Sequence, residues 1–407
     1  MRKTIISFVL ILLCAAGAEA ATLAKSEPVV KFNLYGMDMQ VRFNPAKRVK
    51  VKKATTEEAA KCMEWVGKVG DVTQEDCLRL KQEHQLCDWA YLKMLDKLSQ
   101  TALGNTNEAV VLLTYLFASS GYDCKLMLSE TGKQLRMLYR TDAYVYHKNN
   151  FIVDNKKYFL YGDSVKSNTV CKISPVNFKG TKGVDFRQHQ TFKDEQLSEP
   201  RTLKSLKNPD FAFTVQVNKN LIDFYNEMPT FTYDDNFMTR WSIIANRPLE
   251  QRLQDTLVRQ MKQRLAGRSQ LEQVRELLWW MQGTLDSPEN KDAKDCFLYR
   301  YDEEVWGYDR AFYAEETIFY PYCDTEDRSV LLSRLIRDVV GLDVLLIYYP
   351  GHTAIAVCIT DADVPGAYVV SQGRHFVICD PTYIGSDPGE EMPSMAGKER
   401  TVILLDR

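Results

Sequence analysis

A short internal repeat constrains the fold of this 407-residue chain more than any other feature. Residues 104–113 (GNTNEAVVLL) can be laid over residues 323–332 (CDTEDRSVLL), and each run is predicted to open a helix that stops near Gly121 or Gly341. Apolar, strand-like residues follow in both copies. We therefore predict an α+β protein with two related domains, each a helix packed on an antiparallel sheet, the N-terminal copy being the more divergent.

The first twenty residues have the pattern of a signal peptide. Arg2 and Lys3 give a basic start, residues 5–13 are apolar, and residues 18–20 (AEA) fit the cleavage rule, with cutting expected before Ala21. The apolar stretch is shorter than the about 20 residues that span a bilayer. We expect export to the periplasm or the medium, and no transmembrane segment.

The remaining chain is expected to divide into three parts. Residues 21–165 form the divergent first domain, residues 166–245 a β-containing connector, and residues 246–407 the second domain. Local patterns support several elements within them. A hairpin is predicted over residues 28–43 and a half-buried strand over residues 211–217, where apolar residues alternate. A helix is predicted from Pro248 to Ala266, and a capping box at Ser269 and Glu272 opens the next.

Charge and cysteine content exclude several classes of function. The formal net charge is −2, which argues against nucleic acid as a partner because phosphate binding needs a basic surplus. Neither a GxGxxG nor a P-loop signature is present, and no cysteines or histidines stand at zinc spacing, so we expect no cofactor and no metal. Nine cysteines follow the leader, and Cys62, Cys77 and Cys87 lie close enough in sequence to supply a disulfide, whose connectivity the sequence does not fix.

Chemistry-bearing residues gather in the second copy. Thr325 lies at the start of a predicted helix, with Cys323 two residues before it. His352 follows one apolar strand, and Asp380 ends another. A group at a helix N-terminus, a histidine and an aspartate have the layout of a thiol triad, in which the helix lowers the thiol pKa and the aspartate orients the histidine.

Three motifs in this region resemble the transglutaminase-like superfamily, which has a papain-like Cys-His-Asp site. They are residues 320–329 (YPYCDTEDRS), residues 349–357 (YPGHTAIAV) and residues 380–383 (DPTY), and they are most similar to the exported group common in Bacteroidetes. The resemblance covers about residues 220–390. It implies that His352 is the base and that Asp380 is the residue that orients it.

The sequence departs from the family at the nucleophile. The family motif reads Asp-Cys-Glu-Asp-Arg, so Thr325 occupies the cysteine position. An alcohol has a much higher pKa than a thiol, and threonine nucleophiles mostly use their own free amine, which an internal Thr325 lacks. The first copy has Thr106 at that point and no histidine near residues 132–136, so we expect it to be inert.

Three functions follow from this reading. The first is a non-catalytic protein that binds a peptide, a protein or a cell-envelope component through the degenerate site. The second is an active acyl-transfer enzyme, a peptidase, amidase or transglutaminase, that uses Cys323 or Thr325. The third is a structural scaffold, in which the aromatic-rich residues 306–322 form a contact surface. Within the site, we expect Arg328 to pair with Glu315 or Glu316.

Overall fold

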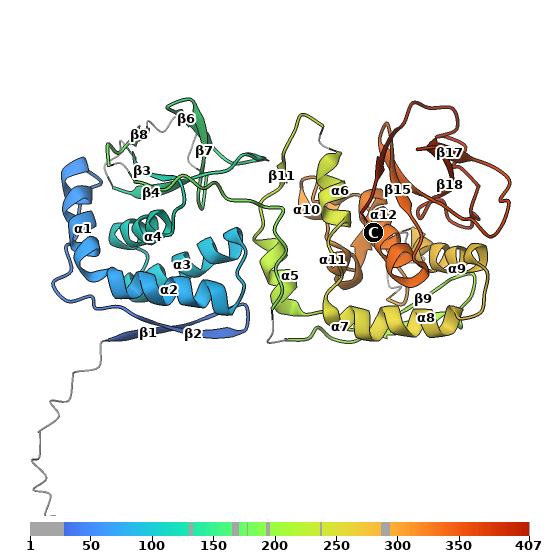
Figure 1. The fold of residues 1–407 in the computed structure, drawn as a ribbon, viewed down its shortest axis with the longest axis horizontal. Coiled ribbons are helices and arrows are strands. Elements are labelled where there is room, and N and C mark those ends of the chain that lie inside the picture. Colours follow the sequence, from blue (N-terminus) through green and yellow to red (C-terminus); the bar gives the residue numbers. More distant parts are fainter. Residues whose placement is uncertain are drawn as a thin grey trace, which may run out of the picture.

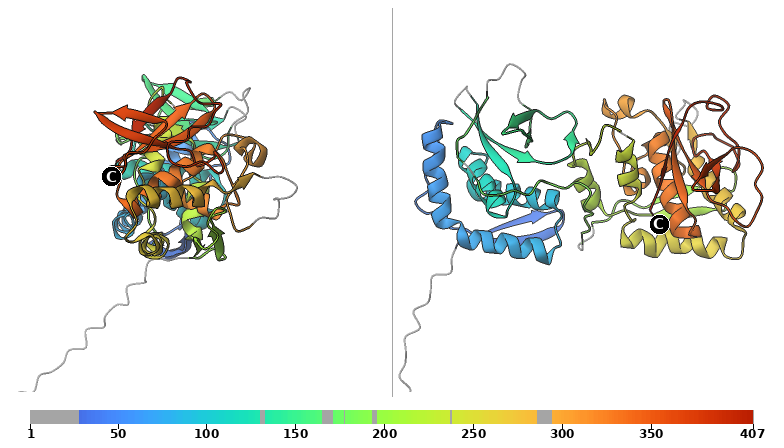
Figure 2. Two further views of the ribbon diagram at one scale, coloured as in Figure 1. Left: turned by 90° about the vertical axis from the view of Figure 1, so that its right-hand side faces the viewer. Right: turned by 45° about the horizontal axis from the view of Figure 1, so that its top comes forward.

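The computed structural model describes residues 28–129, 133–164, 171–176, 178–192, 196–236, 238–285 and 294–406. The expected signal peptide, residues 1–20, lies outside these ranges. The chain forms two α+β lobes that stand side by side, the N-terminal lobe in blue and green and the C-terminal lobe in yellow to red (Figures 1 and 2). In each lobe a sheet lies over a layer of helices.

The N-terminal lobe begins with a β-hairpin, β1 (Val29–Leu34) and β2 (Met37–Arg42). The prediction for residues 28–43 is confirmed, because Phe32 lies opposite Met39 and both side chains are buried. Gly36 has a φ of 80° at the turn, a backbone conformation that residues with a Cβ rarely adopt.

Four helices follow the hairpin, and the last of them packs on the N-terminal sheet. Thr106 caps this helix, because its side chain accepts a hydrogen bond from the backbone N–H of Ala109. Leu112 and Leu116 lie on its buried face. The helices are α1 (Thr56–Val69), α2 (Asp71–Glu83), α3 (Asp88–Leu103) and α4 (Asn107–Ser119).

The N-terminal sheet has five antiparallel strands in the order β6-β7-β4-β3-β8. Its central strands β4 and β3 carry the apolar side chains that meet α4. The strands are β3 (Cys124–Ser129), β4 (Leu135–Arg140), β6 (Asn150–Val153), β7 (Lys156–Leu160) and β8 (Cys171–Ile173).

The expected connector, residues 166–245, divides between the two lobes. Its hairpin, β9 (Arg201–Lys204) and β10 (Ala212–Val215), packs on the C-terminal lobe, where Trp280 Nε1 donates a hydrogen bond to the carbonyl of Leu203 at 3.1 Å. The alternation predicted for residues 211–217 is confirmed by the buried side chains of its apolar members. Between the lobes lie α5 (Lys219–Asn226) and β11 (Phe231–Thr232), which pairs back onto β5 (Tyr144–Val145).

Most helices of the C-terminal lobe lie on one side of its sheet. The helical run expected from Pro248 begins at Gln251 and includes a π-helical turn, η1, while the capping box at Ser269 and Glu272 is confirmed. The helical elements are α6 (Thr239–Ala245), α7 (Gln251–Leu253), η1 (Gln254–Val258), α8 (Arg259–Leu265), α9 (Gln270–Gln282), α10 (Asp302–Trp306), α11 (Ala314–Phe319), α12 (Thr325–Leu335) and the π-helical turn η2 (Ile336–Val340).

The C-terminal sheet also has five antiparallel strands, in the order β17-β18-β16-β15-β19. They are β15 (Val344–Tyr349), β16 (His352–Val357), β17 (Tyr368–Ser371), β18 (Arg374–Cys379) and β19 (Thr401–Leu404). A small parallel sheet lies beside them, made of β12 (Thr284–Leu285), β13 (Leu298–Tyr299) and β14 (Tyr322–Cys323).

The two large sheets have the same topology. The strands correspond in chain order: β3 to β15, β4 to β16, β6 to β17, β7 to β18 and β8 to β19. With this correspondence the two strand orders are the same, and every pairing is antiparallel in both sheets. In each lobe the helix before the sheet, α4 or α12, packs on its central strands. The internal repeat in the sequence therefore corresponds to two copies of one α+β architecture.

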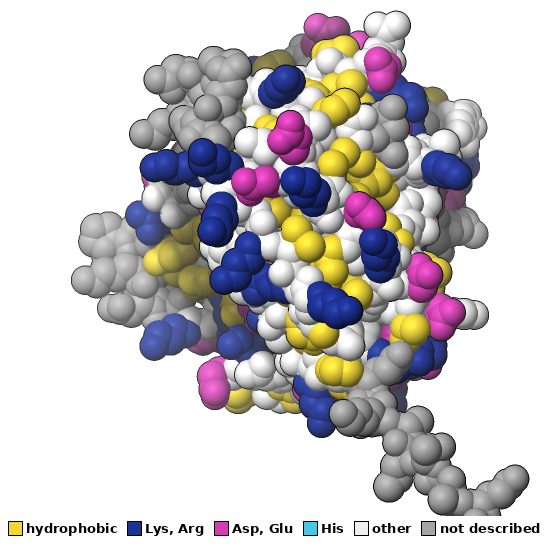
Figure 3. Space-filling model, turned by 90° about the vertical axis from the view of Figure 1, so that its left-hand side faces the viewer, with side chains coloured by type: hydrophobic (Ala, Val, Ile, Leu, Met, Phe, Trp, Pro, Cys, Tyr) yellow, Lys and Arg dark blue, Asp and Glu magenta, His cyan; other side chains and the backbone are white. Residues whose placement is uncertain are grey.

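Two further features concern the surface and the cysteines. Lys and Arg side chains are scattered over the end face of the N-terminal lobe, with Asp and Glu between them, so this face is not a single cationic patch (Figure 3). No helix within the described ranges is long and apolar enough to cross a membrane. None of the nine described cysteines forms a disulfide, and Cys62, Cys77 and Cys87 are all buried thiols.

Candidate functional site

The first part of the candidate site is the N-terminus of α12. Asp324 caps this helix, its side chain accepting hydrogen bonds from the backbone N–H groups of Glu326 at 3.1 Å and Asp327 at 3.3 Å. Asp327 completes a capping box by accepting from the N–H of Asp324 at 3.4 Å. Thr325 therefore occupies the first helical position, where the positive end of the helix dipole lies, and its side chain is 7% exposed.

The second part is a buried histidine–aspartate pair. His352 begins β16, Asp380 directly follows β18, and these strands are neighbours in the sheet. His352 Nε2 lies 2.7 Å from Asp380 Oδ2, and both side chains are buried. The other oxygen of Asp380 accepts from the N–H groups of Thr382 at 2.9 Å and Tyr383 at 3.2 Å, and from the Thr382 hydroxyl at 2.8 Å. The turn thus fixes the carboxylate that holds the imidazole.

Arg328 connects α12 to the aspartate turn. Its side chain is fully buried and donates to the carbonyl oxygens of Gln282, of Phe297 at 3.2 Å, and of Thr284 and Pro381 at 3.4 Å each. Pro381 follows Asp380 directly, so the guanidinium links the helix that bears Thr325 to the turn that bears Asp380.

The pairing expected between Arg328 and Glu315 or Glu316 is wrong. Glu316 pairs instead with Arg310, and Glu315 accepts from the backbone N–H of Glu250 at 2.9 Å.

A hydroxyl–carboxylate network occupies the space between α12 and β16. Thr325 Oγ1 donates to one oxygen of Glu326, and Thr353 Oγ1 donates to the other at 3.1 Å. Ser329 adds a hydrogen bond from its hydroxyl to the carbonyl of Thr353 at 3.1 Å. The proton that a base would have to remove from Thr325 is thus already donated to a carboxylate that is not part of the His352–Asp380 pair.

Cys323 lies behind the site. It ends β14, an edge strand of the small parallel sheet, its side chain is 1% exposed, and its thiol donates to the carbonyl of Leu298 at 3.8 Å. Burial raises the thiol pKa above its ordinary value, although nearby Arg328 partly opposes this effect. A nucleophilic thiol needs access and a lowered pKa, and this environment provides neither.

Three carboxylates meet beside the α12 N-terminus. Asp302, Asp324 and Asp327 each place an oxygen within 4.8 Å of the others, and burial raises the pKa of Asp302 to about 7 and those of Asp324 and Asp327 well above the usual range. Oxygen ligands of this kind suit a hard cation. The carboxylates are, however, already engaged by backbone N–H groups, Asp302 by Arg310 at 2.8 Å and Asp327 by Phe312 at 3.1 Å. We read the trio as the anchor that holds residues 302–312 against α12.

The corresponding positions of the N-terminal copy lack this chemistry. Thr106 is the N-cap of α4, which is the role of Asp324 in the second copy, so the first helical position corresponding to Thr325 is Asn107. Leu135 begins β4 where His352 begins β16. Asp163 lies three residues beyond the end of β7, whereas Asp380 follows β18 directly.

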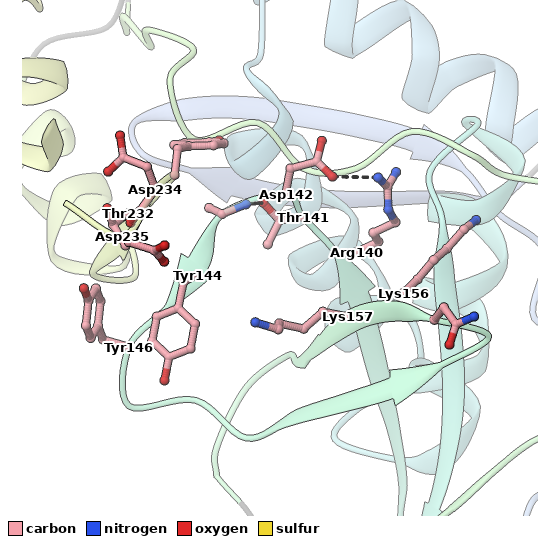
Figure 4. Close-up of a pocket in the computed structure, with 13 residues that line it drawn as sticks. Arg140, Thr141, Asp142, Tyr144, Tyr146, Lys156, Lys157, Thr232, Asp234 and Asp235 are labelled. Carbon is pink, nitrogen blue, oxygen red and sulfur yellow. Dashed lines mark hydrogen bonds and ion pairs between the residues drawn. The ribbon is translucent and has the colours of Figure 1, made fainter. Parts of the chain in front are cut away.

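A second candidate site is a hollow of about 580 Å³ in the N-terminal lobe. Residues at the ends of β4 and β7 line it together with β5 and the segment that follows β11 (Figure 4). The lining carries aromatic, basic and acidic side chains, among them Tyr144, Tyr146, Lys157 and Asp235. Sequence patterns did not predict this hollow. It forms where β11 pairs with β5, and these two strands are far apart in the sequence and share no motif.

Sequence reasoning also missed two residues of the first site. They are Thr353, which lies within the motif of residues 349–357, and Asp302, which precedes the aromatic-rich residues 306–322. The signal available for Asp302 was its place in a run of acidic residues, 302–304, which does not by itself indicate which carboxylate turns inward.

Comparisons with protein-family models, with curated proteins and with solved structures give no match to this chain.

Proposed function

We propose that the chain is an exported, transglutaminase-like protein that has lost the nucleophile and acts by binding a peptide or cell-envelope ligand at the α12 site. The observation that carries the proposal is the hydrogen bond from Thr325 to Glu326. It directs the hydroxyl proton to a carboxylate, while His352 is paired with Asp380. Resemblance of the three motifs to the superfamily supports the assignment, and so does the matching topology of the two sheets.

Catalysis by Thr325 meets three obstacles. The alcohol has no free amine of its own to act as base, its proton is held by Glu326, and its methyl group crowds the attack on a carbonyl. Catalysis by Cys323 meets another, because the thiol is buried and its pKa is raised. The retained histidine uses Nε2 to pair with Asp380, so its second ring nitrogen is the polar group that we expect a ligand to engage.

The first experiment replaces Thr325 by cysteine in the mature chain. A thiol at the first position of α12, within reach of His352 as the layout of a thiol triad requires, is expected to have a lowered pKa, so at pH 6.5 it should react with iodoacetamide faster than a free thiol. The double variant with His352→Ala is the control and should lose this advantage. A Thr325→Cys thiol that reacts no faster than a free thiol would overturn the proposed similarity of the α12 site to a thiol triad.

The second experiment tests inactivity of the parent chain. The parent should neither incorporate an amine donor into casein nor hydrolyse a p-nitrophenyl ester above the buffer rate. Turnover that is lost in both Thr325→Val and His352→Ala would show that the site is catalytic and would replace binding by acyl transfer. Thr325→Val is the matched change, because it preserves the shape of the side chain and removes the hydroxyl.

The third experiment tests binding. Alkylation of Thr325→Cys with iodoacetamide plugs the site, and the plugged protein should sediment less with an isolated cell-envelope fraction than the unmodified variant does. Equal sedimentation of both forms would contradict ligand binding at the α12 site.

A further inference from the structure

The hollow in the N-terminal lobe offers an unusual combination of side chains. Thirteen residues line it, and Ala143 is their single aliphatic member. Its basic residues are Arg140, Lys156 and Lys157, and its acidic residues are Asp142, Asp234 and Asp235, so the two signs balance. Three tyrosines complete the lining, Tyr144, Tyr146 and Tyr233.

Several of these groups are already committed to the fold. Arg140 pairs with Asp142 at 2.6 Å, and Lys156 pairs with Asp123 at 3.1 Å. The hydroxyl of Tyr233 donates to Asp185 at 2.8 Å. These contacts hold the walls of the hollow in place. The charged groups that make them are already paired and do not bind a ligand.

Other lining groups remain available. Within the described ranges, no hydrogen bond or ion pair engages the ammonium of Lys157, the carboxylate of Asp235 or the hydroxyls of Tyr144 and Tyr146. Lys157 extends toward the Tyr144 ring, with its ammonium 5.1 Å from the ring centroid (Figure 4). A ligand would therefore meet one cationic donor, one anionic acceptor and two phenols that both donate and accept.

The tyrosines belong to a track of rings that leads from the hollow to the C-terminal lobe. Tyr144 and Tyr146 meet edge to face with centroids 5.0 Å apart, Tyr146 lies 6.5 Å from His147, and His147 lies 6.0 Å from Tyr308. Tyr144 is 43% exposed and Tyr308 is 42% exposed. A row of large, solvent-exposed rings along a surface is typical of a contact site.

The chemistry of the lining discriminates among ligand classes. A nucleic acid needs a surplus of cations, and the charges here balance. A peptide is usually held through apolar side-chain pockets or an added strand, and the lining has Ala143 as its single aliphatic side chain. An uncharged polyhydroxyl ligand with apolar ring faces fits both the aromatic rings and the donors and acceptors of both signs.

We propose that the hollow and its ring track bind a neutral oligosaccharide, with sugar rings stacked on Tyr144 and Tyr146 and sugar hydroxyls bonded to Lys157 and Asp235. The track toward Tyr308 indicates a chain of several sugars rather than a single one. This site is separate from the α12 site, and its assignment does not depend on the function proposed there.

Affinity electrophoresis of the mature chain in native gels tests the proposal. The gels contain soluble starch, xylan, mannan or mixed-linkage β-glucan, and at least one of these should retard the protein. Tyr144→Ala should weaken the retarding interaction about five- to tenfold, because it removes one stacking face. Asp235→Asn should weaken it about two- to fivefold with little risk to folding, since this exposed carboxylate has no hydrogen-bond or ion-pair partner within the described ranges.

Tyr368→Ala is the matched control. Tyr368 is 47% exposed on β17 of the other lobe, so its removal should leave retardation unchanged. No retardation by any of the four polysaccharides would overturn the proposal. Retardation that survives both Tyr144→Ala and Asp235→Asn would also overturn it, because the sugar would then bind elsewhere.

Discussion

Replacement of Arg328 by methionine is expected to destabilise the C-terminal lobe strongly. The guanidinium is fully buried and donates to four carbonyl oxygens. Two of these acceptors depend less on the guanidinium, since Phe297 also accepts from the N–H of Thr284 at 2.9 Å and Thr284 belongs to β12, which pairs with β13. The backbone carbonyls of Gln282 and Pro381 accept no other hydrogen bond from the described residues.

The magnitude follows from those two carbonyls. Each buried carbonyl left without a donor costs about 1–3 kcal/mol. Methionine fills part of the volume and spares the cost of burying a charge, which lowers the total. We therefore expect the free energy of unfolding to fall by roughly 2–4 kcal/mol.

Urea unfolding of the parent and the variant measures this change, provided that the slope with denaturant is the same for both. Arg334→Met is the matched control on the same helix. Arg334 is also buried and pairs with Asp338, which keeps a hydrogen bond from Gln254 at 2.6 Å when the arginine is gone. The free energy of unfolding of the control should fall by about 1 kcal/mol. Equal losses in the two variants would refute the claim that Arg328 links α12 to the Asp380 turn.

Two further predictions concern titration and thiol reactivity. Burial raises the pKa of Asp302 from its ordinary 3.8 to about 7, so the folded state holds a proton that the unfolded state releases, and stability should fall as the pH rises from about 4 to 7. The free energy of unfolding, measured with urea, should fall less between pH 5 and pH 8 in Asp302→Asn than in the parent. An equal fall in the two proteins would contradict the raised pKa of Asp302. Iodoacetamide should modify half-buried Cys171 of the native protein well before Cys323, mapped by mass spectrometry. Selective early labelling of Cys323 that His352→Ala abolishes would instead support a catalytic thiol.

Local sequence patterns predicted the elements whose cause is local. Alternating apolar residues predicted the first hairpin and β10, and the capping box at Ser269 and Glu272 predicted the start of α9. These signals act through the side chains of a few neighbouring residues, so they can be read without knowing the fold. The internal repeat added the two-lobe architecture, because similar helix-then-strand orders bury their apolar faces in similar ways.

Long-range packing was not predictable in the same way. The β9–β10 hairpin joins the C-terminal lobe through contacts such as that of Trp280 with the carbonyl of Leu203, and any residue offers such a carbonyl. The partners of Arg328 are also backbone carbonyls, so no residue type in the sequence identifies them. A search for complementary charges therefore pointed to Glu315 and Glu316, which other groups engage.

Positions of site residues were easier to predict than their hydrogen bonds. The prediction that His352 and Asp380 meet follows from strand order and is confirmed by their 2.7 Å contact. The direction of the Thr325 hydroxyl depends on the Glu326 side chain, which the sequence shows only as an acidic residue in a first helical turn. That side-chain direction decides whether a retained histidine can act on the threonine.

The two lobes suggest how one architecture can support two different surfaces. In the C-terminal lobe, the ends of β16 and β18 bring His352 and Asp380 together, and Glu326 links Thr325 to Thr353, the residue after His352. In the N-terminal lobe, Asn107 and Leu135 occupy the corresponding positions, and neither side chain can act as a base. Its polar surface instead forms where β11 pairs with β5, a pairing that has no counterpart among the described strands of the other lobe. Two sheets of the same topology can therefore carry polar surfaces at different places.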